Sequence, residues 1–230
     1  MGSENMGAYL IYFVFIMIIP LWAQFRVKST YAKYQKVQNR TGMTGEQVAR
    51  RILDENGLYD VTIHAVKGHL TDHYDPSKKG VFVSEDNFFG TTIAGTAVAA
   101  HEVGHAIQDA QNYNFMRVRS ALVPVANLSS NMAYVFILIG IIFTALNSFL
   151  LIGIALMAAG VLFQLVTLPV EFDASSRALN QLVSTGILQS DEEPQARKVL
   201  SAAAMTYVAA AAVAVMELLR LLLIYLGRRE

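Results

Sequence analysis

The chain lacks cysteine altogether among its 230 residues. It can therefore form no disulfide, no thiolate zinc site and no cysteine nucleophile. Its formal net charge is zero, and with neither a basic stripe nor a glycine-rich phosphate loop it is not expected to bind nucleic acid. Charged residues are also scarce, at 16% against 54% apolar residues, a composition too apolar for an ordinary soluble domain of this length.

The apolar residues are grouped in long blocks rather than scattered. Residues 6–23 carry no charge over 18 positions and residues 149–170 carry none over 22, lengths that approach or reach a bilayer crossing. A third block, residues 121–146, contains four polar residues between positions 127 and 131, which we expect to form a stripe facing protein. The second and third blocks together predict a transmembrane helical hairpin over residues 121–170.

The fourth apolar block, residues 199–226, is interrupted by Glu217 and Arg220. Charged side chains are costly at membrane depth unless they are paired or lie near an interface. This block is therefore expected to be a fourth transmembrane helix or a partly interfacial one. A transporter that uses these two residues as buried charges is a further, weaker alternative.

The first apolar block is expected to be a retained anchor over residues 6–25. Its leader has no Lys or Arg, and no clear small-residue cleavage site follows, as a secretory signal would require. Five basic residues lie between Arg26 and Arg40, whereas none precedes the anchor. The positive-inside bias then places the N-terminus outside and the chain from Arg26 onward in the cytoplasm.

Residues 26–120 have the character of a small soluble unit. Thr44 opens a capping-box pattern before a helix that should stop at the Asn-Gly pair at 56–57. Residues 61–66 and 80–84 read as two short strands, which we expect to pair as a β-hairpin.

An H-E-x-x-H motif, residues 101–105, follows a helix-prone run and predicts a helix from about residue 92 to 111. Residues four apart share one helix face, so His101 and His105 can offer two nitrogens to one ion, beside Glu102. Zinc needs such ligands together with an open position for water. The alternative is a pair of packed helix histidines, which the helical placement of the whole motif disfavours.

A third ligand must come from elsewhere in the chain, since this motif supplies only two. Glu171 is the best candidate, because two crossings separate it from His105 and an even number returns the chain to the same side. We expect it to lie in a cytoplasmic helical segment over residues 171–198. Asp173 is a rival ligand or a partner that orients a histidine ring, and a solvated carboxylate at a helix N-terminus is the alternative for Glu171.

Several further segments resemble the YugP-type neutral zinc metallopeptidases, which are bacterial multi-pass membrane proteins. The similar segments are residues 21–24 (LWAQ), 56–61 (NGLYDV), 70–76 (LTDHYDP), 101–106 (HEVGHA), 120–124 (SALVP) and 168–175 (LPVEFDAS). They spread over nearly the whole chain, so the resemblance is far more specific than the metal-binding motif alone.

The resemblance implies one zinc ion per chain at His101, His105 and Glu171, with Glu102 as catalytic base, in the inner membrane of a bacterium. The positive-inside bias then places this site on the cytoplasmic side. The chain also looks like a distant relative of the gluzincin membrane proteases. Those carry an acidic residue four positions after the third ligand, where this chain has Ser175. Asp173 is the candidate to substitute for that residue.

The predicted reaction is peptide hydrolysis, in which Glu102 takes a proton from the attacking water and gives it to the leaving amine. His73, Tyr74 and Arg177 are candidate donors to the oxyanion, with His73 preferred, although His73 could equally stabilise its loop. Arg177 is also a candidate to support the ligands, together with Asp173. A peptide substrate is expected to lie extended along an edge of the 61–84 hairpin.

The predicted fold is a mostly α membrane protein, with about four transmembrane helices and a small α+β cytoplasmic catalytic unit resembling a zincin. A non-catalytic zinc-binding membrane scaffold or regulator is the alternative function. Glu102 disfavours it, because a structural zinc site needs no base and usually closes its fourth position.

Overall fold

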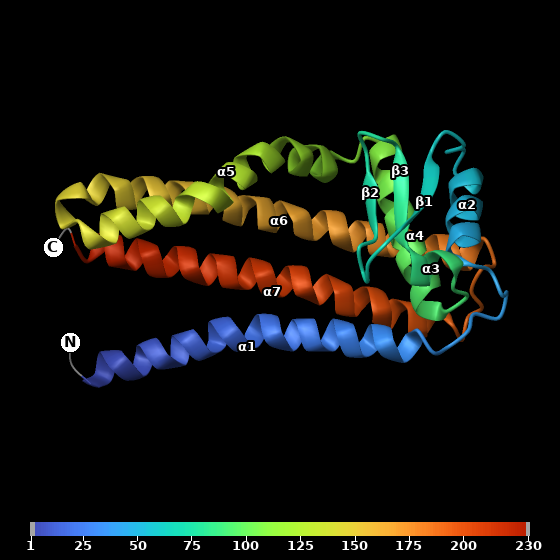
Figure 1. The fold of residues 1–230 in the computed structure, drawn as a ribbon, viewed down its shortest axis with the longest axis horizontal. Helices are drawn as coiled ribbons and strands as arrows, with labels where there is room; N and C mark the ends of the chain where they lie inside the picture. Colours follow the sequence, from blue (N-terminus) through green and yellow to red (C-terminus); the bar gives the residue numbers. More distant parts are fainter. Residues whose placement is uncertain (1–2, 229–230) are drawn as a thin grey trace. The chain divides into compact units, whose positions relative to one another are not determined.

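The computed structural model describes residues 3–228 and divides into two compact units (Figure 1). The apolar unit consists of Met1–Trp22, Arg117–Leu168 and Thr206–Glu230, and the α/β unit of Ala23–Met116 and Pro169–Met205. The helices and strands in chain order are α1 (Ser3–Tyr34), α2 (Gly45–Glu55), β1 (Thr62–Val66), β2 (His73–Asp75), β3 (Gly80–Ser84), α3 (Glu85–Phe89), α4 (Ile93–Ala110), α5 (Asn114–Ile142), η1 (Thr144–Leu146), α6 (Asn147–Ser184) and α7 (Glu193–Leu226).

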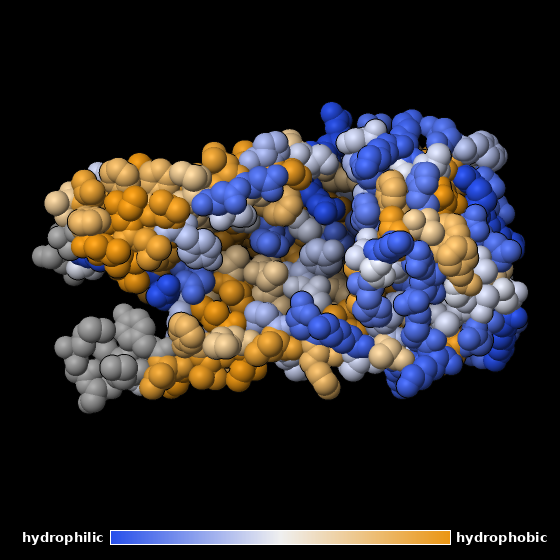
Figure 2. All heavy atoms as spheres, viewed as in Figure 1, coloured by the Kyte–Doolittle hydropathy of each residue, from blue (hydrophilic) through white to orange (hydrophobic). Residues whose placement is uncertain are grey.

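Among the described residues, four helices are long and apolar enough to cross a membrane, namely α1, α5, α6 and α7. Their most apolar windows bury between 6% and 28% of their residues in the protein, so most of their apolar side chains face outward. Figure 2 shows this as a largely orange surface over the apolar unit. A mostly α membrane protein is therefore confirmed, and the block at residues 199–226 lies within a candidate spanning helix.

Within the apolar unit, α5 and α6 approach each other closely at two glycines. A Cβ atom on Gly140 of α5 would lie 2.3 Å from the backbone nitrogen of Leu150 on α6. One on Gly153 of α6 would lie 2.6 Å from the side chain of Ile137. Small residues at such crossings let two backbones approach within a bilayer, where no hydrophobic force draws helices together.

The polar stripe predicted between positions 127 and 131 does not face protein as a whole. Only Ser129 is buried, where it donates a hydrogen bond to the carbonyl of Leu156, and the other three polar residues are exposed. Successive helix residues point about 100° apart, so four residues in a span of five cannot share one face.

The charged pair in α7 is satisfied locally. Arg220 donates to Glu217 Oε2 at 2.9 and 3.0 Å, and its guanidinium lies 5.5 Å from the ring centroid of Tyr12. The pairing meets the condition under which charges are tolerated among apolar helices.

The α/β unit contains one three-stranded sheet in the order β1-β3-β2. The two strands predicted at residues 61–66 and 80–84 exist, but β1 and β3 pair parallel, so the predicted hairpin between them is wrong. The antiparallel hairpin joins β2 to β3 instead. A parallel pair needs a crossover of about a dozen residues, and β2 lies within that crossover.

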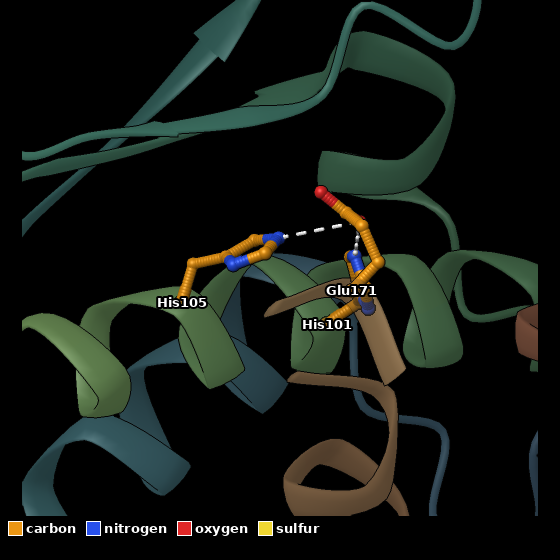
Figure 3. Close-up of side chains that lie close together, drawn as sticks. All are labelled: His101, His105 and Glu171. Atoms are coloured by element: carbon orange, nitrogen blue, oxygen red, sulfur yellow. Dashed lines mark hydrogen bonds and ion pairs between the residues drawn. The ribbon is translucent and has the colours of Figure 1, made fainter. Parts of the chain in front are cut away.

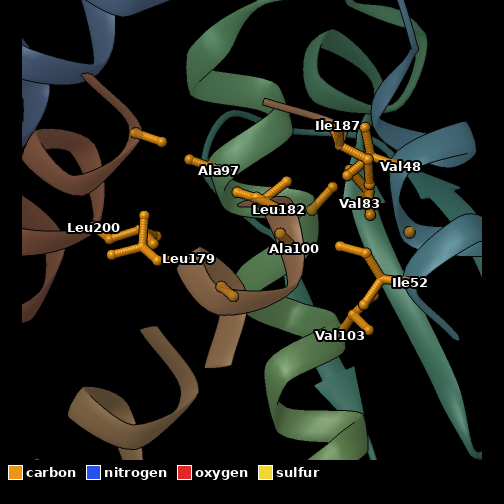
Figure 4. Packing of buried hydrophobic residues seen from close by; sticks show 14 of the residues in the cluster. Val48, Ile52, Val83, Ala97, Ala100, Val103, Leu179, Leu182, Ile187 and Leu200 are labelled. Carbon is orange, nitrogen blue, oxygen red and sulfur yellow. The ribbon is translucent and has the colours of Figure 1, made fainter. Parts of the chain in front are cut away.

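The helices of this unit begin and end where local signals predict. Thr44 caps α2 with a complete capping box, and Thr92 caps α4 by accepting from the backbone of Gly95. Buried residues of α2, β3, α4, α6 and α7 form one core (Figure 4). Each fully buried Val, Leu or Ile side chain contributes about 1.5–3 kcal/mol to the stability of this core.

Helix α6 passes through Pro169 without a break. Glu171 therefore lies on the helix that also contains the apolar block at residues 149–170, and not on a new helix after it. The expected segment at residues 171–198 comprises the end of α6, a turn and the start of α7.

Candidate metal centre

Helices α4 and α6 bring three potential ligands together within the α/β unit. His101 and His105 lie one turn apart on α4, with ring centroids 4.7 Å apart and ring planes at 81°. Glu171 approaches them from α6 (Figure 3). One ligand atom from each of the three residues lies within 4.8 Å of the others.

The geometry converges on one carboxylate oxygen. Glu171 Oε2 lies 3.3 Å from His101 Nε2 and 3.7 Å from His105 Nε2. All three side chains are largely buried, with Glu171 only 3% exposed. Two imidazole nitrogens and one carboxylate oxygen are the donor set of a zinc site that keeps a fourth position open, so these residues fit zinc.

Gly104 allows α6 to come this close to α4. A Cβ atom at this position would lie 2.5 Å from the carbonyl oxygen of Ala174, a distance that real Cβ atoms do not adopt. Glycine within a helix costs about 1 kcal/mol relative to alanine. Gly104 lies at the point where the helix carrying Glu171 crosses the helix carrying the two histidines, so the close crossing explains a glycine at this position.

The outer nitrogen of each histidine ring has its own partner. His101 Nδ1 lies 3.2 Å from Ser175 Oγ on α6, and His105 Nδ1 lies 3.0 Å from Gln108 Oε1 on α4. With Nδ1 of both rings occupied, the two Nε2 atoms face Glu171. Such outer hydrogen bonds fix ring orientation in metal sites.

Asp173 lies one step further out than Glu171. Its Oδ2 accepts from Gln108 Nε2 at 2.8 Å and from Arg177 Nε. Arg177 also donates to Gln111 Oε1 at 2.6 Å. Of the two predicted candidates for third ligand, Glu171 is the one brought to the histidines, while Asp173 and Arg177 tie α6 to α4 beside them.

The charges around the histidines favour a cation. Burial lowers the pKa of His105, but hydrogen bonding to Glu171 and the charges of Glu102 and Glu171 outweigh it, and the net pKa is raised. Burial raises the pKa of Glu102, while His101 and His105 act in the opposite direction. Two carboxylates beside two imidazoles thus create a negative potential, which a divalent cation would neutralise.

His73 does not join this cluster. Its ring stacks on Phe82 at 4.8 Å, and His64 stacks on the same ring at 5.0 Å. Neighbouring strand residues alternate between faces, and it is Tyr74 that reaches α4, donating to Asp109 Oδ2 at 2.9 Å. His73 therefore lies on the opposite face of the sheet from α4.

The rest of the 70–76 segment stabilises loops. Asp72 Oδ1 accepts hydrogen bonds from the backbone nitrogen of Ser84 at 2.8 Å and from Asn87 Nδ2 at 3.1 Å. Asp75 accepts from the backbone nitrogen of Ser77 at 2.9 Å. The Asp75 contact is a turn of the kind expected for aspartate, whereas the Asp72 contacts tie the loop to the end of β3 and to α3.

Comparison with known proteins identifies the family of the chain. The profile of a family described as "Putative neutral zinc metallopeptidase" matches residues 9–226. The chain belongs to this family. It is also 49% identical over 222 residues to the "Putative membrane protease YugP" of Bacillus subtilis (strain 168), covering 95% of this chain and 98% of that protein. No solved structure matches the chain.

Two contacts to the histidines, from Gln108 and Ser175, were not predicted from the sequence of this metallopeptidase family member. Gln108 lies three residues after His105, on the same helix face, and is a buried amide in an otherwise apolar turn. Ser175 lies four residues after Glu171, on the same face of α6, and its hydroxyl contacts His101. Helical spacing from a proposed ligand was the available signal for both.

Proposed function

We propose that this chain is a zinc-dependent membrane endopeptidase whose metal is held by His101, His105 and Glu171. The observation that carries the proposal is the convergence of the two Nε2 atoms on Glu171 Oε2, at 3.3 and 3.7 Å, in a buried site. The family description and the protease name of the Bacillus relative support the same reaction class.

Zinc bound by these residues would polarise a peptide carbonyl and increase the acidity of a water molecule. Glu102 acts as the general base, taking a proton from the attacking water and delivering it to the leaving amine. Its place beside His101 on α4 and its pKa, raised by burial, suit a carboxylate that must accept and then release a proton.

The substrate is a peptide or protein, and β2 offers an edge along which an extended segment could pair. Tyr74 of this strand donates to Asp109 on α4, which holds that edge against the helix carrying the metal-binding motif. A substrate-bound structure with no main-chain pairing to the sheet would contradict this part of the proposal.

A Glu102→Gln variant tests the function directly. We expect it to retain zinc and to lose activity on a fluorogenic casein substrate by roughly 10²–10⁴-fold, the usual contribution of general acid–base catalysis. The alternative, a zinc-binding scaffold, predicts no casein cleavage by the intact protein. A Glu55→Gln variant, at an exposed position of α2, is the control and should keep full activity.

We further propose a bacterial cell-membrane location with the α/β unit in the cytoplasm, supported by the basic residues between Arg26 and Arg40. The absence of cysteine makes this testable with single introduced cysteines. In intact protoplasts, a membrane-impermeant maleimide should label Ser148→Cys, an exposed position in the first turn of α6, but not Ser77→Cys. Labelling of Ser77→Cys alone would show the opposite orientation, with the α/β unit outside the cell.

A further inference from the structure

Gln108 is held in one orientation by three hydrogen bonds. The side chain is fully buried, and its Nε2 donates to the carbonyl of Val170 and to Asp173 Oδ2, both at 2.8 Å. Both of these partners can only accept, so the amide nitrogen must face them. Its carbonyl oxygen Oε1 therefore faces His105 Nδ1, 3.0 Å away.

This orientation determines which nitrogen of His105 carries a proton. An amide oxygen can only accept, so the hydrogen bond requires a proton on His105 Nδ1. The Nε2 atom is then left with a lone pair directed toward Glu171, 3.7 Å from its Oε2. A neutral imidazole binds a metal through the nitrogen that lacks the proton.

We propose that Gln108 is the positioning residue of the metal centre, holding His105 in the form that binds metal through Nε2, and that Asp173 locks Gln108 in place. This inference rests on the proposed function, because it concerns the same metal. Asp173 acts on the ligand through an amide, and Arg177 in turn holds Asp173.

His101 has a different kind of support. Its Nδ1 faces the hydroxyl of Ser175 at 3.2 Å, and a hydroxyl can donate or accept. Ser175 therefore does not dictate the position of the proton on His101. Of the two histidines, only His105 therefore has a neighbour, Gln108, that determines which ring nitrogen carries the proton.

The test separates positioning from a structural link between helices. Zinc affinity is measured by chelator competition on detergent-purified intact protein and on Gln108→Met, which keeps the side-chain length but removes the amide. Gln181→Met is the matched control, because Gln181 lies on α6 in the same unit and bonds only weakly to Asn56, at 3.4 Å. Thermal unfolding of the zinc-free forms reports whether each variant is folded.

We expect Gln108→Met to bind zinc about 10–100-fold more weakly, the usual effect of losing a partner of a ligating histidine. Asp173→Ala should show a smaller loss, because Val170 still holds the amide, and Gln181→Met should show none. Folded Gln108→Met with the affinity of the intact protein would overturn the inference. Absence of zinc binding by the intact protein would instead overturn the proposed function.

A second measurement does not depend on the variant folding. Nitrogen-15 spectra of the histidine rings in the intact, zinc-loaded protein identify the protonated nitrogen of the assigned His105 ring. We expect the proton on Nδ1, in slow exchange with solvent because it is buried against Gln108. A proton on Nε2, with zinc on Nδ1, would overturn the inference whatever the variants show.

Discussion

The two units of this protein obtain their internal order in different ways. In the α/β unit, buried polar side chains are paired through specific hydrogen bonds, as in the contacts among His105, Gln108 and Asp173. In the apolar unit, α5 and α6 pack through apolar side chains and approach closely at Gly140 and Gly153. The candidate metal centre lies in the unit where polar groups are positioned by partners, while the other unit supplies helices suited to a bilayer.

The largest effect on stability and zinc binding is expected at Gly104, where a close helix approach at glycine lies beside the hydrogen-bonded metal centre. Gly104→Ala places a Cβ atom 2.5 Å from the carbonyl of Ala174, so α6 must move away from α4. We expect a loss of roughly 1–3 kcal/mol in stability from overpacking, together with weaker zinc binding because Glu171 is displaced. Thermal unfolding and chelator competition measure the two effects. Unchanged zinc affinity would show that the close approach does not position the ligand.

The matching change in the apolar unit is Gly140→Ala, which places a Cβ atom 2.3 Å from the backbone of Leu150. We expect a similar loss of thermal stability in detergent, since small residues govern such crossings, but an unchanged zinc affinity. Gly7→Ala, where a Cβ meets no atom within 4 Å, is the control for both glycine variants. A fall in zinc affinity in Gly140→Ala equal to that in Gly104→Ala would contradict the separation of the two units.

A smaller loss of stability is expected at Thr44, the N-cap residue of α2. Thr44→Ala removes the side-chain half of the capping box on α2 and should cost about 1 kcal/mol of stability. Zinc affinity should stay the same, because α2 contributes to the core and not to the ligands. Chemical denaturation of the zinc-free protein provides the measurement, and a loss of zinc at this variant would show that the core and the metal site are coupled.

The elements with local signals were the ones that the sequence predicted well. The cap at Thr92 and the helix from about residue 92 to 111 depend on neighbours in the chain, and α4 agrees with them. The sheet was mispredicted because β2 has only three residues, His73–Asp75, too few to show a strand pattern. This strand forms the local hairpin with β3, so β1 pairs with the other edge of β3 over a longer sequence separation, and that pair is parallel.

The residues of the candidate metal centre also fall into those that the sequence predicts and those that depend on distant partners. His101 and His105 follow from spacing within one helix, and Glu171 from a count of membrane crossings. Gln108 could not be assigned a role from the sequence because its partners Val170 and Asp173 lie on another helix, more than 60 residues away. His73 was preferred as an oxyanion donor because its segment was expected to be a loop near the site. In the structure it lies in β2, and its ring stacks on Phe82.

The most direct test of the proposed metal centre is the zinc content of the detergent-purified protein beside Glu171→Ala and Asp173→Ala. We predict one zinc per chain in the intact protein, loss of zinc in Glu171→Ala, and retention with reduced affinity in Asp173→Ala. Full retention of zinc in Glu171→Ala would remove the third ligand. A metal-replete intact protein without zinc would contradict the account as a whole.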